Sequence, residues 1–180
     1  MILGEGDGRF LERFLEGQPD CSVTVLEQSS RMVELARARL TSKQRERVRF
    51  LLEDAVTFRL NSACYDLIVT AFFLDCFTAQ GLAHLVPKLA ASLKPGGWWY
   101  YADFSTPPQG WRRVRGNAYL TAMHAFFRWQ TGLQTWRLAD PEPLFRDYLR
   151  LLERRDLNHG MLTCRLYRRT TAVDCTLQCQ

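Results

Sequence analysis

The stretch Ile2-Leu3-Gly4-Glu5-Gly6-Asp7-Gly8-Arg9-Phe10, at the start of the chain, decides the fold. Two aliphatic residues form the end of a strand, three glycines follow, and apolar residues then recur at helical spacing from Phe10 to Leu15. Glycines between a strand and a helix let the backbone turn sharply and let a ligand approach it closely. The stretch therefore predicts a β-α unit with a ligand-binding loop at residues 4–8.

The chain beyond this unit alternates strand-like and helix-like segments, which is typical of β-α units around a parallel sheet. Further strands are expected at Ser22–Leu26, Val48–Leu52, Tyr65–Thr70 and Trp98–Phe104. Further helices are expected after a cap at Ser29 or Ser30, over Gly81–Leu93, over Trp111–Thr131 and from Pro141 to about Leu152. Two final strands are expected up to Arg169, with a turn at Asn158-His159-Gly160. The predicted fold is a three-layer, Rossmann-like α/β fold whose mostly parallel sheet ends in an antiparallel C-terminal edge.

Length and composition predict one soluble globular domain. The chain has 180 residues, of which 47% are hydrophobic and 24% are charged. The domain is expected over residues 1–169, with an insert or lid at about 105–140 and an irregular tail at 170–180. No transmembrane segment and no secretory signal are predicted, so a cytoplasmic location is expected. The six cysteines form no C-x-x-C pair, and no metal site is predicted.

An acid at the end of the second expected strand points to the kind of ligand. Glu27 stands where a carboxylate can accept hydrogen bonds from both ribose hydroxyls of an adenosine cofactor. A dinucleotide site would have the pattern G-x-G-x-x-G, but Arg9 occupies the sixth position. The loop and Glu27 together therefore favour an adenosine cofactor other than a nicotinamide dinucleotide, and an NAD(P)-binding oxidoreductase is a lower-ranked hypothesis.

Five places, in order along residues 1–105, resemble the class I S-adenosylmethionine-dependent methyltransferases of the small-molecule type. They are the glycine loop, Glu27, Glu53-Asp54-Ala55, Thr70-Ala71-Phe72-Phe73 and Lys94-Pro95-Gly96-Gly97. The resemblance implies methyl transfer from S-adenosyl-L-methionine to a small or lipophilic organic acceptor. It implies cofactor contacts at Gly4, Glu5, Gly6, Gly8, Glu27, Gln28, Met32, Asp54, Ala55, Thr70 and Ala71.

No catalytic residue is assigned, because methyl transfer needs mainly the alignment of donor and nucleophile. Asp75 and His124 are the candidates for a base if the acceptor is a phenol or an enol. The acceptor pocket is expected from the aromatic residues Phe72, Phe73, Phe127 and Trp129. Aromatic residues and arginines in the insert also suit a peripheral contact with a membrane surface.

Two further hypotheses concern function. The chain begins inside the first strand, which predicts a truncated N-terminus without the helices that usually precede this strand in the family. A non-catalytic or degenerate methyltransferase-like binding domain is therefore the alternative. Nucleic-acid methylation ranks third, because residues 70–73 lack the Asn/Asp-Pro-Pro-aromatic motif of enzymes that methylate base amino groups.

Overall fold

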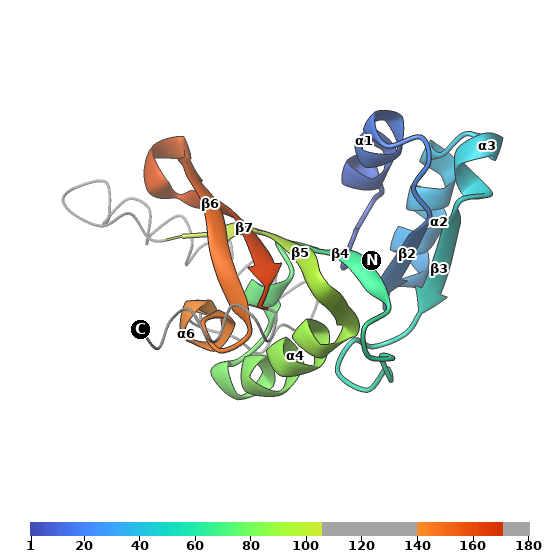
Figure 1. The fold of residues 1–180 in the computed structure, drawn as a ribbon. Helices are drawn as coiled ribbons and strands as arrows, with labels where there is room; N and C mark the ends of the chain where they lie inside the picture. The colour runs from blue at the N-terminus through green and yellow to red at the C-terminus, as the bar shows by residue number, and fades with distance from the viewer. Residues whose placement is uncertain (106–139, 171–180) are drawn as a thin grey trace. The chain divides into compact units, whose positions relative to one another are not determined.

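The computed structural model describes residues 1–105 and 140–170. The chain divides into two compact units, Met1–Leu60 and Asn61–Gln180 (Figure 1). The domain expected over residues 1–169 stays a prediction. Almost all of the expected insert at 105–140, including the helix expected over 111–131, and almost all of the tail at 170–180 lie outside the described residues.

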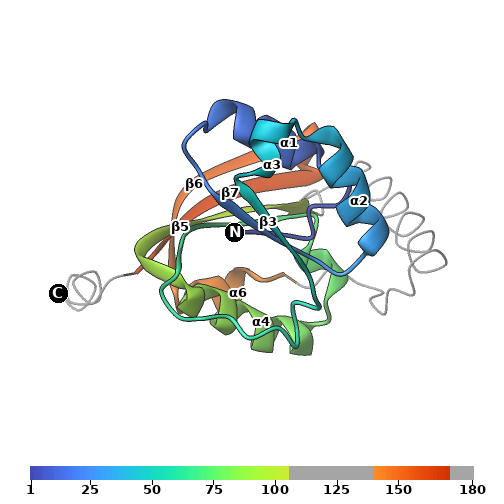
Figure 2. The same ribbon diagram turned by 90° about the vertical axis from the view of Figure 1, so that its right-hand side faces the viewer.

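The first unit is a small parallel sheet with its helices. Strand β1 (Ile2–Leu3) pairs with β2 (Val23–Glu27), and β2 pairs with β3 (Val48–Leu52), both in parallel. The helices are α1 (Arg9–Gly17), α2 (Ser30–Arg39) and α3 (Ser42–Arg45) (Figure 2). The predicted cap of α2 is confirmed, because the Ser29 side chain accepts a hydrogen bond from the backbone N–H of Met32.

The apolar face of α1 shows why this segment is helical. Leu11 and Leu15, four residues apart, are buried, while Arg13 and Glu16 on the other side form an exposed ion pair. The core of the unit also contains buried aliphatic residues of β1, β2 and α2: Ile2, Leu3, Val23, Val25, Leu26, Val33 and Ala36. The glycine loop is thus held between a buried strand and a buried helix face.

The second unit combines parallel and antiparallel strands. Its strands are β4 (Tyr65–Ala71), β5 (Leu93–Phe104), β6 (Leu149–Leu157) and β7 (Leu162–Arg169). β4 and β5 are parallel, whereas β7 runs antiparallel to both β5 and β6. The remaining elements are η1 (Leu74–Cys76), α4 (Ala79–Ser92), α6 (Glu142–Phe145) and η2 (Asn158–Gly160). The predicted α/β class with antiparallel C-terminal strands is confirmed.

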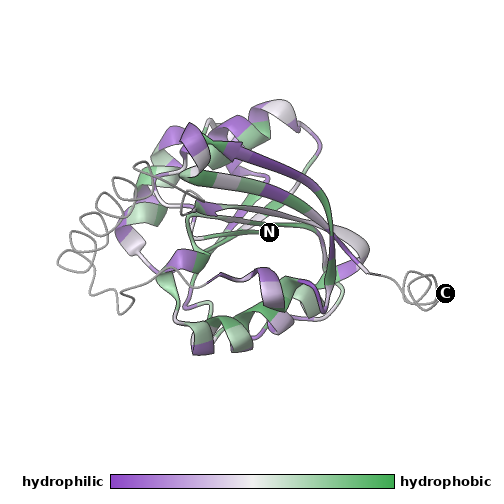
Figure 3. Ribbon diagram, turned by 90° about the vertical axis from the view of Figure 1, so that its left-hand side faces the viewer, coloured by the Kyte–Doolittle hydropathy of each residue, from purple (hydrophilic) through white to green (hydrophobic). Residues whose placement is uncertain are grey.

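Helix α4 and an aromatic cluster form the core of the second unit. Figure 3 shows α4 as largely hydrophobic, and its residues Leu82, Leu85, Val86 and Leu89 are buried. Phe145 of α6 has its ring centroid 5.1 Å from Trp99, 5.5 Å from Tyr101 and 4.9 Å from Tyr167. No helix in the described part of the chain is long and apolar enough to cross a membrane.

Two sequence-based boundaries were wrong. The helix expected from Pro141 to about Leu152 ends at Phe145, and β6 begins at Leu149, where antiparallel pairing with β7 replaces helical hydrogen bonds. Strand β5 begins at Leu93, not at Trp98, because Leu93 already pairs with Tyr65 of β4 before the register shifts.

Candidate functional site

Two of the three glycines in the loop of the first unit have different structural roles. Gly8 has a φ of +89°, and a Cβ atom there would lie 2.6 Å from the Cα atom of Ala36, so only glycine allows this close approach of α1 and α2. Gly6 has a φ of +68°, but a Cβ atom there would meet nothing within 4 Å. Gly8 is therefore required by packing, whereas the space beside Gly6 is open to a ligand.

Glu27 is the residue that ties the glycine loop to the end of β2. Its Oε2 accepts a hydrogen bond from the backbone N–H of Gly6 (3.3 Å), and its Oε1 accepts one from the N–H of Ser29 (2.9 Å). The residue is only partly buried. An ionised carboxylate has about four acceptor positions, so this group can hold the loop and still accept hydrogen bonds from two ligand hydroxyls.

Glu5 stabilises the start of α1 from within the loop. Its Oε1 accepts a hydrogen bond from the backbone N–H of Leu11 (2.8 Å), in a helix whose N-cap, Gly8, has no side chain to do so. Burial is the main cause that raises the pKa of Glu5 to about 7, and the negative charges of Asp7 and Glu27 act in the same direction. A cationic ligand beside this loop would favour the ionised form of Glu5.

The other predicted cofactor contacts of the first unit lie after β2, where Met32 is in the first turn of α2, and after β3. Gln28 and Met32 are exposed, and Ala55 is buried. The carboxylate of Asp54 accepts a hydrogen bond from the backbone N–H of Val56 (2.8 Å), so it orders the turn after β3. Its contact with an adenine stays a prediction.

The predicted residues after β4 belong to the second unit. Thr70 is buried and its hydroxyl accepts a hydrogen bond from the indole N–H of Trp99 (2.8 Å), while Ala71 ends the strand. Phe72 has a φ of +53°, which is rare for a residue with a large side chain, and its exposed ring lies 4.9 Å from the Phe104 ring. Phe73 contacts the ring of Phe77.

A cavity of about 350 Å³ lies at the carboxyl end of β5. Its lining is mostly polar: Asp75, Tyr101, Asp103, Phe104, Ser105, Asp140, Pro141, Arg154, Thr163 and Arg165. Of the predicted site residues of the second unit, Asp75 lines this cavity and the predicted acceptor residues Phe72 and Phe73 do not. His124, Phe127 and Trp129 lie outside the described residues.

The register of β5 against β7 assembles one wall of the cavity. Asp103 pairs with Thr163, and Tyr101 pairs with Arg165. Residues two apart on a strand point to the same face, so all four side chains share one side of the sheet. The Arg165 guanidinium lies 5.8 Å from the centre of the Tyr101 ring.

Asp103 is the buried acid of this wall. It is 2% exposed, and its carboxylate accepts hydrogen bonds from the backbone N–H groups of Asp75 (3.1 Å) and Phe104 (2.8 Å). Burial, followed by the negative charge of Asp75, raises the pKa of Asp103 to about 8. Near neutral pH this carboxyl group can therefore both take up and release a proton.

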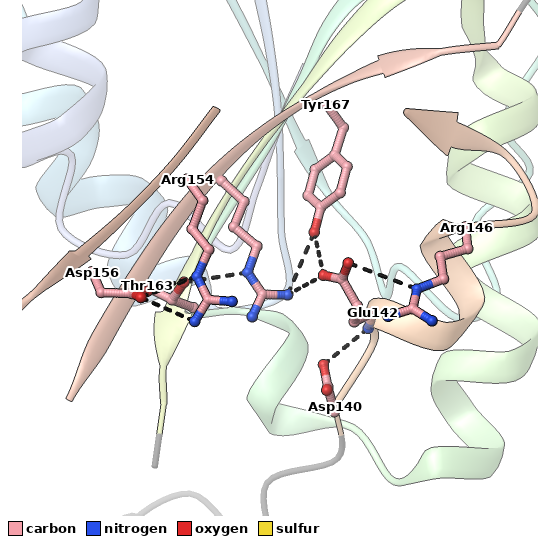
Figure 4. Close-up of polar contacts among 8 residues, drawn as sticks. Asp140, Glu142, Arg146, Arg154, Asp156, Thr163 and Tyr167 are labelled. Carbon is pink, nitrogen blue, oxygen red and sulfur yellow. Dashed lines mark hydrogen bonds and ion pairs between the residues drawn. The ribbon is translucent and has the colours of Figure 1, made fainter. Parts of the chain in front are cut away.

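The two cavity arginines are each paired with an acid (Figure 4). Arg165 forms an ion pair with Glu142, which also accepts a hydrogen bond from the hydroxyl of Tyr167 (2.7 Å). Arg154 forms an ion pair with Asp156 (3.0 Å), and this hydrogen bonding holds the pKa of Asp156 below its usual range.

The sequence-based reasoning missed most of this cavity. An aspartate at the end of the otherwise apolar and aromatic segment 98–104 was a signal for Asp103, because ligands in open α/β sheets bind outside the carboxyl ends of strands. No such signal marks Arg165 or Asp140, which reach the cavity only through the antiparallel register and the turn before α6.

The structure is similar to several solved methyltransferases. One is the N-methyltransferase NodS from Bradyrhizobium japonicum WM9 in complex with S-adenosyl-L-homocysteine (TM-score 0.66, 18% identity, covering 94% of this chain and 76% of that one). Another is an O-methyltransferase family protein from Burkholderia thailandensis (TM-score 0.70, 20% identity, covering 95% of this chain and 50% of that one). A third is an S-adenosylmethionine-dependent methyltransferase from Mesorhizobium loti (TM-score 0.69, 18% identity, covering 93% of this chain and 89% of that one). At these identities the likeness shows the fold.

Comparison of the sequence with known protein families identifies the family more directly than the structural likeness does. No curated protein matches the chain significantly. Residues 1–97 of the 180, which include the glycine loop, Glu27 and the segment 70–73, match the family described as methyltransferase domain. The predicted family is confirmed: the chain belongs to the S-adenosylmethionine-dependent methyltransferases.

Proposed function

We propose that this chain transfers a methyl group from S-adenosylmethionine to a small polar organic acceptor. The observation that carries the proposal is the connection of the glycine loop to Glu27, in which the acid at the end of β2 holds the loop through the N–H of Gly6. The same acid keeps acceptor positions for the ribose hydroxyls of the donor.

The residues of the first unit fit such a donor in three respects. The space beside Gly6 accommodates a ligand next to the backbone. Glu27 accepts hydrogen bonds, and the acids Glu5, Asp7 and Glu27 suit a ligand that carries a sulfonium and an ammonium group. Gly4, Gly8, Gln28, Met32, Asp54 and Ala55 complete the proposed contacts of this unit, and the contacts of Thr70 and Ala71, which belong to the second unit, stay predictions.

Methyl transfer requires mainly that the protein bind and align the two reactants. When bound, the donor supplies a methyl group that its sulfonium has already activated. The chain's own residues bind and orient the two reactants, so that the nucleophile lies in line with the carbon–sulfur bond. No metal is required for this alignment.

The cavity at the end of β5 supports a small polar acceptor over a lipophilic one. Five of its lining residues are charged, and the aromatic residues Phe72 and Phe73 lie outside its lining. NodS is named as an N-methyltransferase and the Burkholderia protein belongs to an O-methyltransferase family, so these relatives do not agree on the methylated atom.

A transfer assay tests the proposal. The chain is incubated with methyl-labelled S-adenosylmethionine and pools of small amines, phenols, alcohols and carboxylates, and labelled product is separated from the donor. We expect label in at least one pool, with release of S-adenosylhomocysteine. Binding of S-adenosylhomocysteine without transfer to any pool would favour the non-catalytic alternative, and stabilisation by NAD(H) alone would overturn the cofactor assignment.

Replacing Glu27 with alanine is expected to weaken binding of S-adenosylhomocysteine by about 1.5 to 3 kcal/mol, the contribution of hydrogen bonds to a charged group. Glu27→Gln keeps one acceptor oxygen and should lose less. Calorimetric titration measures both affinities, and circular dichroism checks folding. Glu16→Ala is the matched control, because Glu16 pairs with Arg13 on the exposed side of α1. Unchanged affinity in folded Glu27→Ala would remove Glu27 from the site.

A further inference from the structure

A second cavity, with a volume of about 330 Å³, lies within the first unit. It is lined by Arg37, Arg45, Val48 and Phe50, all of which belong to the unit Met1–Leu60. Its volume is at the lower end of the range for small-molecule sites in proteins. The cavity is therefore large enough for a small organic ligand.

The position of the cavity along β3 separates it from the proposed donor site. Val48 is the first residue of β3, whereas the last residue, Leu52, pairs with Glu27. At a rise of about 3.3 Å per residue, Val48 lies about 13 Å before the end of the strand. Ligands of open α/β sheets bind outside the carboxyl ends of the strands. The cavity is thus distinct from the site at the glycine loop and Glu27.

Two helices bring the arginines of the cavity to β3. Arg37 lies in the last turn of α2 and Arg45 in the last turn of α3, and both helices contact β3 (Figure 1 and Figure 2). The Nε–H of Arg45 donates a hydrogen bond to the carbonyl oxygen of Leu40 (3.0 Å). A guanidinium has five N–H donors, so four donors of Arg45 remain for a ligand.

The positive charges of these two arginines are not balanced by acids. In the part of the chain that the structure describes, neither Arg37 nor Arg45 forms an ion pair with an aspartate or a glutamate. Arg39, on the same helix as Arg37, differs in this respect because it pairs with Asp7 (3.0 Å). The lining of the cavity contains two cations and no anion. Such a lining attracts an anionic ligand.

The strand side of the cavity is apolar. Val48 and Phe50 are two residues apart on β3, so their side chains share one face of the strand, and both are partly exposed. The guanidinium carbon of Arg37 lies 5.2 Å from the centre of the Phe50 ring, within the range of a cation–π contact. The cavity therefore combines donors for an anion with apolar area for the body of the same ligand.

We propose that this cavity binds a small aromatic carboxylate, with the carboxylate group at Arg37 and Arg45 and the ring against Val48 and Phe50. The planar fork of an arginine matches the two oxygens of a carboxylate. An inorganic anion would leave the apolar side chains of the strand uncovered. This inference goes beyond the proposed function, because the ligand is neither the methyl donor nor the methyl acceptor.

Matched probes test the chemical class of the ligand. 2-Naphthoate, its neutral amide, acetate and inorganic phosphate are each titrated into the full ¹⁵N-labelled chain and followed by NMR. We expect saturable binding of 2-naphthoate, with shifts in the signals of β3 and of the arginine Nε–H groups. Because its ring adds apolar contact, 2-naphthoate should bind about 10-fold more tightly than acetate or phosphate. Equal binding of the amide or of phosphate would overturn the proposal.

Variants test the place of binding. Arg37→Gln and Arg45→Gln should each weaken binding of 2-naphthoate by about 3- to 10-fold, between the effects of an exposed and a buried charged contact. Arg49→Gln is the matched control, because Arg49 lies between Val48 and Phe50 on β3 and its side chain points to the opposite face. Circular dichroism checks folding. An equal loss in Arg49→Gln, or no loss in folded Arg37→Gln and Arg45→Gln, would contradict the assignment.

Competition separates this site from the donor site. S-adenosylhomocysteine should not displace 2-naphthoate from the wild type, and displacement would place the probe in the donor site and overturn the proposal. If both arginine variants fail to fold, the wild-type comparison of 2-naphthoate with its amide, together with the signals that shift, decides. A wild type that binds 2-naphthoate but no S-adenosylhomocysteine would overturn the proposed function and leave this inference standing.

Discussion

Gly8→Ala is expected to lower the free energy of unfolding by about 2 to 5 kcal/mol. The left-handed backbone at Gly8 costs an alanine roughly 1 to 2 kcal/mol. The added methyl group would also lie 2.6 Å from the Cα atom of Ala36, and forcing extra volume into such a contact costs about 1 to 3 kcal/mol more. The midpoint of urea unfolding, followed by circular dichroism, measures the effect.

Two other glycines provide matched controls for this substitution. Gly17→Ala should be nearly neutral, because Gly17 ends α1 with an ordinary φ and open space around it. Gly6→Ala should cost only the backbone strain, but it places a methyl group in the space that we assign to the cofactor. A Gly8→Ala protein as stable as the Gly17→Ala protein would show that α1 and α2 do not meet as described.

Phe145→Ala is expected to lower the free energy of unfolding by about 3 to 5 kcal/mol, the usual cost of removing a fully buried aromatic ring. The ring contacts Trp99, Tyr101 and Tyr167, so its removal leaves a cavity among these side chains. Because Tyr101 also lines the cavity, acceptor turnover should fall in any fraction that remains folded.

The control for Phe145 is an exposed apolar residue of the same unit. Leu152 of β6 is 42% exposed, so Leu152→Ala should change stability by less than about 1 kcal/mol. Thermal unfolding of the two variants gives the comparison. A similar small loss in both would mean that the aromatic cluster around α6 is not a packed core.

The first unit was predictable because its signals are local. The three glycines, the acid at the end of a β-branched strand and the serine that caps α2 all act within a few residues of where they stand. The strand expected at Val48–Leu52 has those bounds in the structure. In each case local propensity and the tertiary fold favour the same conformation.

The C-terminal part was less predictable because its structure depends on distant partners. The sequence after Pro141 is rich in leucine and arginine, which favour a helix. In the structure, Leu149 and Arg150 pair instead with Arg169 and Arg168 of β7. A single-sequence pattern cannot show which strand completes such a pair.

The charged cavity at the end of β5 was missed for the same reason. Asp103 and Arg165 are far apart in the chain and line one cavity only because Tyr101 pairs with Arg165 across β5 and β7. The acceptor pocket expected from the aromatic residues Phe72, Phe73, Phe127 and Trp129 stays a prediction. The charged lining became visible only in the assembled sheet.

Calorimetric titration of S-adenosylhomocysteine into the wild-type chain tests most directly whether the glycine loop and Glu27 form a methyl-donor site. We predict saturable binding at one site per chain, strongly weakened in Gly6→Ala and in Glu27→Ala while both variants keep their fold. Binding that is equally strong in these two variants, or no binding to a folded wild type, would contradict the assignment.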